Sequence, residues 1–352
     1  MVTSFYGKKI TGVLSVLPEK EYFFDEEIAE SEAVKARRLK RIMGYGKRRR
    51  VKKDTTLSQM LMFGINYLIK QDKLKKEDIG AIVVVTLSQD YFLPTISFIL
   101  HGELGLTSDV ICMDIPQGCA GFVIGLMQSF MLLDHMKDKK VLLCTGEIFN
   151  RKSREDEPKF TYPPFGGDIA NITIVENSNS NKEIVYSHYS DGMSGRYLFI
   201  RDGGFKFPMT ADKINQQYNN LPFVGIEMDG SAVFNFVQKE VPPAIEEIAR
   251  LAKVKVEDID WFLFHQPNKF MLQKLAERLE IPYDKMPMDL VENLGNSDSG
   301  TIPAIMTTNV AEQLMNNNYL CCLSGFGAGL TWSSLIMEIG ELTFCENIVS
   351  EL

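Results

Sequence analysis

Short runs of uninterrupted apolar residues alternate along the chain with longer segments in which apolar residues recur every three or four positions. The short runs, which are typical of strands, include AIVVV at 81–85, VLLC at 141–144 and WFLF at 261–264. The longer segments, which are typical of helices, include 57–72 and 241–254. Strands that alternate with helices indicate mostly parallel sheet, and strands without polar positions indicate that both faces are covered. The pattern therefore predicts an α/β protein in which sheets are layered between helices.

The second half of the sequence repeats part of the first. KKEDIGAIVVV at 75–85 corresponds to KVEDIDWFLF at 255–264, and Thr145-Gly146 corresponds to Ser324-Gly325 at nearly the same separation. A chain of 352 residues is also long enough for about two domains. We therefore predict two similar α/β halves, residues 1–180 and 181–352.

Two uncharged segments, 116–133 and 319–337, approach the length of a membrane span. Each contains a Gly-rich turn, QGCAG in the first and SGFGAG in the second, that would leave backbone groups without partners in lipid. We interpret both segments as buried core elements of a protein that does not cross a membrane.

Six cysteines in a chain of this length have neither the density nor the spacing of a disulfide scaffold or a zinc site. The N-terminal segment MVTSFYGKKITGVLSVLPEK has only a short apolar stretch, with no cleavage pattern after it, so we expect no signal peptide. Together these features predict a cytoplasmic protein with reduced thiols and no bound metal.

A basic segment interrupts an otherwise acidic chain. The formal net charge is -8, yet residues 35–53 hold eleven Lys or Arg and no acidic residue. Such a segment is either a solvated face or a site that attracts a phosphate-bearing ligand or an acidic protein. Nucleic acid is disfavoured, because the acidic remainder repels a long polyanion and Tyr45 is the segment's only aromatic residue.

Three polar residues lie where catalytic groups are commonly found. Cys119 lies in QGCAG, between a predicted strand and a predicted helix whose positive end would lower the pKa of the thiol. His265 follows the strand WFLF, at the end of a buried strand where α/β folds bind ligands. Asn296 lies in the polar turn LGNSDSGTIP. A structural cysteine, a core histidine and a turn or N-cap asparagine are the alternatives that each residue leaves open.

The motifs around these residues, in this order, resemble those of the ketoacyl-ACP synthase III group of the thiolase superfamily over nearly the whole chain. QGCAGF is similar to the family's nucleophile motif, HQPN to its His-Gln-x-Asn motif, and LGNSDSGTIP to its Gly-Asn-(Thr/Ser) motif. GFGAGLTW at 325–332 is similar to its C-terminal glycine motif, and MDGSAVFNF and GGD are further likenesses. The resemblance implies a thiolase-like fold, with two duplicated α/β halves in a layered αβαβα arrangement.

The resemblance also implies a reaction, the formation of a β-ketoacyl thioester. Cys119 would take an acyl group as a thioester, with the backbone N–H groups of Cys119 and Ala328 as the oxyanion hole. A malonyl thioester would then lose carbon dioxide while His265 Nε2 and the Asn296 amide donate hydrogen bonds to its thioester oxygen. Two donors and a nucleophile need no metal and no cofactor, because the substrates carry phosphopantetheine or coenzyme A. The implied partners are acyl carrier protein or acyl-coenzyme A, malonyl carrier protein and a second copy of the chain.

Some positions depart from the family pattern. Arg38 stands where bacterial members have a tryptophan that stacks on the adenine of coenzyme A, and Phe270, beside Lys269, replaces an arginine that holds the carrier protein. Leu93 replaces a phenylalanine that reaches into the partner subunit's acyl pocket. Because Arg38 offers adenine less apolar contact than an indole and lies in a strongly basic segment, we expect an acyl carrier protein to be preferred over coenzyme A as the donor. The predicted substrate-binding residues are Leu93, Asn268, Arg38 and Gly327.

Two alternatives to decarboxylative condensation stay open. The chain could be a non-decarboxylating acyltransferase, in which His265 is the general base that activates an alcohol or amine acceptor. It could also be a non-catalytic scaffold that partners active condensing enzymes.

Overall fold

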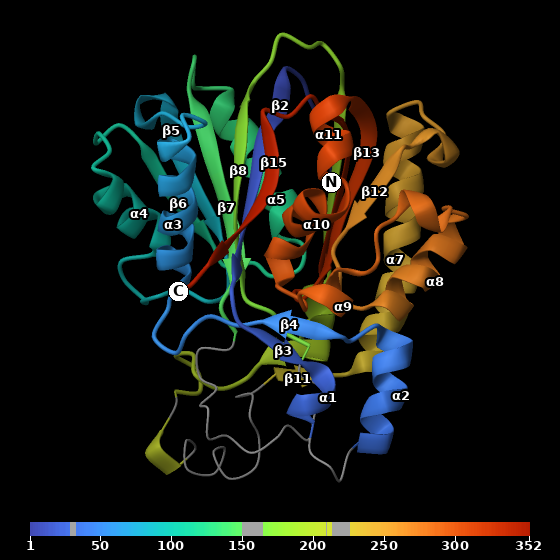
Figure 1. Cartoon of the computed structure of the whole chain (residues 1–352). Coiled ribbons are helices and arrows are strands. Elements are labelled where there is room, and N and C mark those ends of the chain that lie inside the picture. Colours follow the sequence, from blue (N-terminus) through green and yellow to red (C-terminus); the bar gives the residue numbers. More distant parts are fainter. Residues whose placement is uncertain (29–32, 150–164, 209, 213–225) are drawn as a thin grey trace.

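A computed structural model describes residues 1–28, 33–149, 165–208, 210–212 and 226–352. Two sheets stand side by side, with helices between them and on their outer faces (Figure 1). This is the predicted αβαβα layering of a thiolase-like fold.

The first sheet has six strands in the order β15-β2-β8-β7-β5-β6. The bounds of these strands, in chain order, are Lys8–Pro18 (β2), Ile79–Val85 (β5), Ile111–Ile115 (β6), Lys140–Glu147 (β7), Ile169–Asn177 (β8) and Phe344–Ser350 (β15). Strand β5 is fully buried and pairs in parallel with both β6 and β7. Side chains at the carboxyl ends of these strands therefore meet at one edge of the sheet.

The second sheet has five strands in the order β1-β9-β14-β13-β12. Their bounds are Val2–Phe5 (β1), Ile184–Ser190 (β9), Trp261–Phe264 (β12), Asn318–Gly327 (β13) and Thr331–Gly340 (β14). Strands β12 and β13 are parallel, whereas β13, β14, β9 and β1 pair antiparallel. Strand β8 is also antiparallel to both of its neighbours in the first sheet. The prediction of mostly parallel sheet is therefore wrong, because hairpins and long returning strands alternate with the parallel units.

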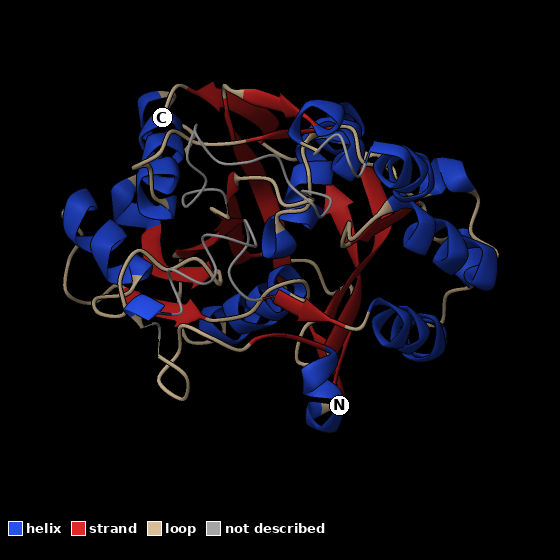
Figure 2. Ribbon diagram, turned by 90° about the horizontal axis from the view of Figure 1, so that it is seen from below, coloured by secondary structure: helices blue, strands red, loops and turns tan. Residues whose placement is uncertain are grey.

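Helices fill three layers around the two sheets (Figure 2). The central layer holds α5 (Gly121–Leu133), α10 (Thr301–Asn309) and α11 (Ala311–Asn316), whose buried side chains pack with residues of both sheets. The outer face of the first sheet is covered by α3 (Leu57–Lys70) and α4 (Ile96–Leu104). The outer face of the second sheet is covered by α7 (Gly230–Leu251) and α8 (Lys269–Leu279). Because α5 is buried between two sheets, it is apolar on nearly all sides, as its sequence GFVIGLMQSFMLL requires.

The sequence repeat corresponds to a repeated structural unit. The 3₁₀ turn Lys76–Asp78 leads into β5, which pairs in parallel with β7. In the same way, the 3₁₀ turn Val256–Asp258 leads into β12, which pairs in parallel with β13. The terminal strands cross over, since β1 lies in the second sheet and β15 in the first. The division into residues 1–180 and 181–352 stays a prediction.

Smaller elements lie at one end of both sheets, in the lower part of Figure 1. They comprise the hairpin β3 (Glu21–Phe23) and β4 (Lys47–Arg49), the strands β10 (Leu198–Ile200) and β11 (Ile226–Met228), and the helices α1 (Phe24–Glu27), α2 (Ala33–Met43) and α9 (Leu290–Asn293). Short 3₁₀ turns span Gly192–Tyr197, Tyr283–Lys285 and Asp298–Gly300.

The two uncharged segments are core elements, as predicted. Residues 116–133 contain α5, and residues 319–337 form most of β13 and β14. Among the helices that the structure describes, none is both long and apolar enough to span a bilayer. Helix α7 begins well before the predicted 241–254 segment and contains Pro242 and Pro243.

Candidate active site

Cys119 lies in the tight connection between β6 and α5, directly before the N-cap residue Ala120. Two close approaches require glycine around it. A Cβ on Gly121 would lie 2.6 Å from Val85 Cγ1, and a Cβ on Gly325 would lie 2.7 Å from Ala120 Cα. The nucleophile turn is therefore packed tightly between β5 and β13, and the Cys119 side chain is buried.

The fold brings Cys119 together with one predicted residue and one unpredicted residue. His265 directly follows β12, and Asp298 lies in the turn before α10. Ligand-type atoms of Cys119, His265 and Asp298 all lie within 4.8 Å of one another. The Cys119 thiol donates a hydrogen bond to Asp298 Oδ1 over 3.4 Å. The expectation that no metal takes part stays a prediction.

Sequence reasoning did not select Asp298 as a functional residue. Its only sequence signal is that it is the one acid in the glycine- and serine-rich turn LGNSDSGTIP, two positions after Asn296. The backbone of Asp298 is left-handed, with φ 46°, a conformation that asparagine and aspartate tolerate better than most residues.

Asn296 is oriented by a backbone hydrogen bond. Its Oδ1 accepts from the N–H of Asp298 over 2.9 Å, so its amide nitrogen keeps both hydrogens for another acceptor. The main chain of Asn296 is held on both sides, since its N–H donates to Phe165 O over 2.7 Å and its carbonyl accepts from Gly167 N over 3.0 Å. The turn cannot accept a side chain at Gly295, whose φ is 82° and whose Cβ would lie 2.9 Å from Gly167 N.

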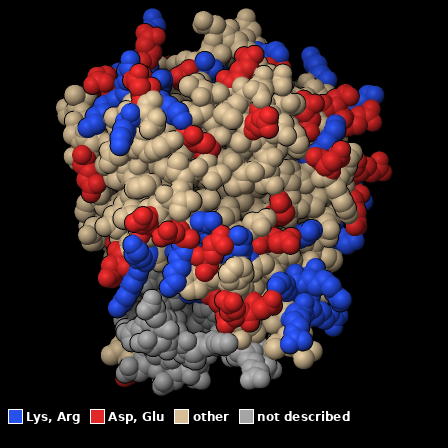
Figure 3. Space-filling model, in the orientation of Figure 1, with Lys and Arg blue, Asp and Glu red and all other residues tan. Residues whose placement is uncertain are grey.

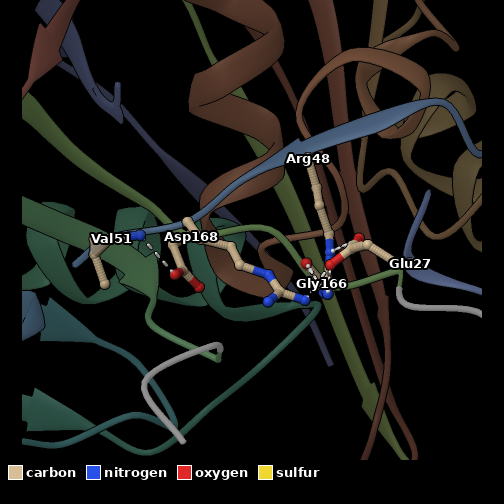
Figure 4. A network of polar contacts seen from close by, with 6 residues as sticks. Glu27, Arg48, Val51, Gly166 and Asp168 are labelled. Atoms are coloured by element: carbon tan, nitrogen blue, oxygen red, sulfur yellow. Dashed lines mark hydrogen bonds and ion pairs between the residues drawn. The ribbon is translucent and has the colours of Figure 1, made fainter. Parts of the chain in front are cut away.

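A buried ion pair anchors the chain at Gly166, which pairs with Asn296. Figure 4 shows this ion pair and its neighbours. Arg48 of β4 donates to the Glu27 carboxylate from Nε and Nη2, both over 2.8 Å, and from Nη1 to Gly166 O over 2.9 Å. Asp168 accepts from the backbone N–H groups of Val51 and Phe149, over 3.1 and 2.9 Å. The hairpin β3-β4 and helix α1 are thereby tied to the chain beside the candidate active site.

These contacts correct part of the interpretation that residues 35–53 attract a phosphate-bearing ligand or an acidic protein. Arg50 pairs with Glu27, and Arg49 pairs with Glu21 over 2.8 Å. Arg48 and Arg50 are both buried. The arginines at 48–50 are therefore paired within the fold, and exposed basic side chains remain on α2 and at Lys52 and Lys53.

Burial keeps His265 neutral. Loss of hydration lowers its pKa to about 3, although a hydrogen bond to the backbone of Asp298 opposes the shift. Its Nδ1 lies 2.8 Å from Thr301 Oγ1, and the Thr301 hydroxyl also lies 2.9 Å from the carbonyl oxygen of Asp298, to which it can donate. Because the hydroxyl has one hydrogen, its direction decides which nitrogen of His265 carries the ring proton.

The pKa of the Cys119 thiol is raised well above its ordinary value, mainly by burial and next by the charge and hydrogen bond of Asp298. The prediction that the start of α5 lowers this pKa is therefore wrong, because loss of hydration and a neighbouring carboxylate outweigh the helix end. Burial also raises the pKa of Asp298 to about 6, whereas the hydrogen bond from Cys119 opposes that shift. The resting site is a thiol, a neutral imidazole and a carboxyl group that titrates near neutrality.

Two backbone N–H groups face the Cys119 sulfur. Those of Ala328 and Cys119 form hydrogen bonds that partly counter the rise of the thiol pKa. Ala328 lies in the turn between β13 and β14, and its carbonyl accepts from Gln117 Nε2 over 3.2 Å. Gly327 leaves room for the nucleophile, because its Cβ would lie 2.6 Å from Cys119 Sγ. That these two N–H groups form an oxyanion hole stays a prediction.

The other predicted binding residues lie further out. Asn268 caps α8, and its Oδ1 accepts from Met271 N over 2.9 Å. Arg38 is exposed on α2, and Leu93 is exposed before α4. Phe270 stacks on Phe234 with ring centroids 5.5 Å apart, so it packs between α7 and α8.

Known proteins share both the sequence and the fold. Residues 249–339, which include His265, Asn296 and Ala328, match the family described as 3-oxoacyl-[acyl-carrier-protein (ACP)] synthase III C terminal. The β-ketoacyl-[acyl-carrier-protein] synthase III of Lactobacillus helveticus is 30% identical over 294 residues, which cover 83% of this chain and 87% of that protein. The chain belongs to the β-ketoacyl-[acyl-carrier-protein] synthase III family.

Two further known proteins, one compared by sequence and one by structure, are similar to this chain over almost its whole length. A putative 3-oxoacyl-[acyl-carrier-protein] synthase 3 of Campylobacter jejuni is 29% identical over 357 aligned residues, covering 99% of this chain and 98% of the relative. The crystal structure of a 3-oxoacyl-(acyl-carrier protein) synthase from Burkholderia xenovorans superposes with a TM-score of 0.89 at 26% identity, covering 99% of each chain. The chain is accordingly a condensing enzyme of the acyltransferase class.

Proposed function

We propose that this enzyme transfers an acyl group to Cys119 and then condenses it with a malonyl thioester, giving a β-ketoacyl thioester. The observation that supports this most is the convergence on one sulfur atom of a histidine, a carboxyl group and two backbone N–H groups. A structural cysteine would need none of these neighbours.

In the first half-reaction, Cys119 Sγ attacks the carbonyl carbon of the donor thioester. The developing oxyanion accepts hydrogen bonds from the backbone N–H groups of Cys119 and Ala328, which are already in place before charge develops. Collapse of the tetrahedral intermediate breaks the bond to the donor sulfur and leaves the acyl group on Cys119.

In the second half-reaction, the malonyl thioester loses carbon dioxide and its enolate attacks the acyl carbon on Cys119. The new carbon–carbon bond forms as the bond between the acyl carbon and Cys119 Sγ breaks, and Cys119 leaves as a thiolate that takes up a proton from solvent. The enolate oxygen accepts hydrogen bonds from His265 Nε2 and the Asn296 amide. A neutral imidazole suits this role, because a pKa of about 3 makes His265 a donor rather than an acid. Nε2 carries the proton only when the Thr301 hydroxyl turns its hydrogen from the Asp298 carbonyl oxygen to Nδ1.

The exposed basic helix α2 supports an acidic carrier protein as donor. Figure 3 shows blue side chains gathered at the lower right, at the position of α2 in Figure 1. Arg37, Arg38 and Arg41 are exposed there. Acyl carrier protein, which the names of the relatives contain, is acidic and presents its acyl group on a phosphopantetheine arm. We infer that it is preferred over coenzyme A.

The open edge of the first sheet supports a homodimer. Strand β6 is the last strand at that edge, and Ile111 on it is 39% exposed. The neighbouring loop exposes Tyr91, Phe92 and Leu93, three large apolar side chains. An apolar sheet edge of this kind is a site for pairing with another strand, and a second copy supplies a matching one across a two-fold axis.

The test is whether product formation requires malonate. The protein is incubated with acetyl-coenzyme A, or with the acetyl carrier protein, and with malonyl carrier protein, and the β-ketoacyl thioester and carbon dioxide are both quantified. We expect equal amounts of the two products and none without the malonyl thioester. Acyl esters or amides formed from an added alcohol or amine without malonate would support the non-decarboxylating acyltransferase instead.

A further inference from the structure

The proposed mechanism does not use the side chain of Asp298, although it contacts the nucleophile. Its Oδ1 accepts the hydrogen bond of the Cys119 thiol over 3.4 Å. Its Oδ2 lies against Gly118, where a Cβ would come within 3.3 Å. Asp298 as a whole residue keeps some accessible surface, unlike Cys119 and His265.

The other titratable groups around Asp298 are poor proton carriers. His265 is neutral and its pKa is far below neutrality. Glu147, at the end of β7, is fully buried and accepts from Leu87 N, Thr86 Oγ1 and Ser88 Oγ, and burial and next the charge of Asp298 raise its pKa well above the ordinary value. Helix α10 and strand β8, which also pack against the turn, face it with Thr301 and Asn171, neither of which titrates.

We propose that Asp298 is a further catalytic residue, the base that takes the Cys119 proton as the sulfur attacks and that then returns it to the departing carrier thiol. This role rests on the proposed acylation of Cys119. It assigns to the carboxylate the proton transfer for which the neutral His265 is unsuited.

The proton balance of the step is complete without another reactant. The bond between Sγ and the acyl carbon forms as the Sγ–H bond breaks and the proton passes to Oδ1. When the bond between the acyl carbon and the donor sulfur breaks, the carrier leaves as a thiol with the proton from Asp298. The carboxylate is restored, and the net charge of the buried site does not change, so no second buried anion has to form.

Asp298→Asn is the variant that tests this role, because asparagine has the same shape and tolerates the left-handed backbone. Acylation of Cys119 by acetyl-coenzyme A is followed by rapid quench and intact mass between pH 5 and pH 9. In the unsubstituted protein we expect the rate to rise to a plateau above about pH 6, where Asp298 is ionised. In Asp298→Asn we expect a rate on the order of 100-fold lower at pH 6.5, still rising at pH 9 because only the thiolate then reacts.

Alkylation of Cys119 by iodoacetamide separates this role from a structural one. Removing the carboxylate removes one cause of the raised thiol pKa, so Asp298→Asn should be alkylated at pH 8 at least as fast as the unsubstituted protein. Slower acylation with undiminished alkylation would establish proton transfer. Loss of both reactions, or an unchanged plateau of acylation in the variant, would overturn it. Failure of the unsubstituted protein to acquire the acetyl group would overturn the proposed function as well.

Discussion

At the residue scale, His265 and Asn296 have a different task from Cys119. His265→Ala and Asn296→Ala should still accept an acyl group on Cys119, because neither residue supplies a donor of the oxyanion hole. Decarboxylation should fall about 100-fold or more in each variant, since each removes one hydrogen bond to the enolate. Single-turnover acylation and release of carbon dioxide are measured separately for each protein. Equal loss of both half-reactions in Asn296→Ala would contradict the assignment.

The Thr301 hydroxyl contacts Nδ1 of His265, which yields a second prediction at this scale. Valine has the shape of threonine but no hydroxyl, so Thr301→Val removes the group that lies 2.8 Å from Nδ1. We expect condensation to fall about tenfold, the effect of roughly one hydrogen bond, while acylation stays within about twofold. Thr301→Ser, which keeps the hydroxyl, is the control. A Thr301→Val enzyme that condenses as fast as Thr301→Ser would show that the hydroxyl does not matter.

Short motifs predicted the positions of residues that lie in local turns. They did not predict the pKa of those residues, which depends on burial in the folded protein. Cys119 and His265 follow strands that the apolar pattern identifies, so both could be placed at one edge of the sheets. The pKa of Cys119 could not be predicted, because it depends on Asp298, which is 179 positions away and reaches the thiol only through the tertiary fold. A single acid in a polar turn carries too weak a signal to reveal such a contact.

At the element scale, helix α8 depends on Asn268, whose side chain caps its first turn. Asn268→Ala should lower the free energy of unfolding by about 1 kcal/mol, the usual effect of losing an N-cap. Asn268→Asp keeps the cap but loses the amide donor, so it should be as stable as the unsubstituted protein and show a higher KM if that amide also binds substrate. Chemical denaturation and steady-state kinetics give the two quantities. Asp229→Ala, which removes the cap of α7, is the stability control. Full stability of Asn268→Ala would rule out the capping role.

Buried strands and amphipathic helices could be predicted because their patterns are local, whereas pairing direction could not. The run WFLF predicts β12 wherever it pairs, but the antiparallel pairs of β14 with β9 and of β8 with β2 join segments far apart in the chain. The basic segment shows the same limit. Its two parts have similar charge, yet α2 exposes its arginines, whereas Arg48 of β4 and Arg50 directly after it are buried against Glu27.

At the scale of the whole molecule, the open edge at β6 predicts a dimer. Light scattering at micromolar concentration should give twice the chain mass. Ile111→Lys combined with Leu93→Asp should shift the protein toward monomer, because charges at a pairing edge oppose strand addition. Val349→Lys is the matched control, since Val349 is 50% exposed on β15 at the opposite edge of the same sheet. A monomeric unsubstituted protein with full activity would contradict the dimer.

The charge distribution predicts how the carrier is chosen. Acylation of Cys119 is measured with the same acyl chain on acyl carrier protein and on coenzyme A, at low and at high salt. We expect the carrier protein to be the faster donor at low salt, and the preference to shrink at high salt, since ions screen charges over about 10 Å at 0.1 M. Neutralising Arg37, Arg38 and Arg41 with alanine should reduce the preference, whereas Lys137→Ala, at the opposite end of β7 from the site, should not. Faster acylation from coenzyme A at low salt, or a preference that salt does not change, would mean that α2 is only a solvated face.

The central claim is that Cys119 carries the acyl group, and mass spectrometry tests it most directly. The protein is incubated with acetyl-, butyryl- and octanoyl-thioesters of coenzyme A and of acyl carrier protein, and the adduct is located by peptide mapping. We predict a single acyl adduct on Cys119 that disappears when malonyl carrier protein is added, and no adduct on a folded Cys119→Ala variant. An adduct that persists in Cys119→Ala, or that maps to Cys144 or Cys321, would contradict the account.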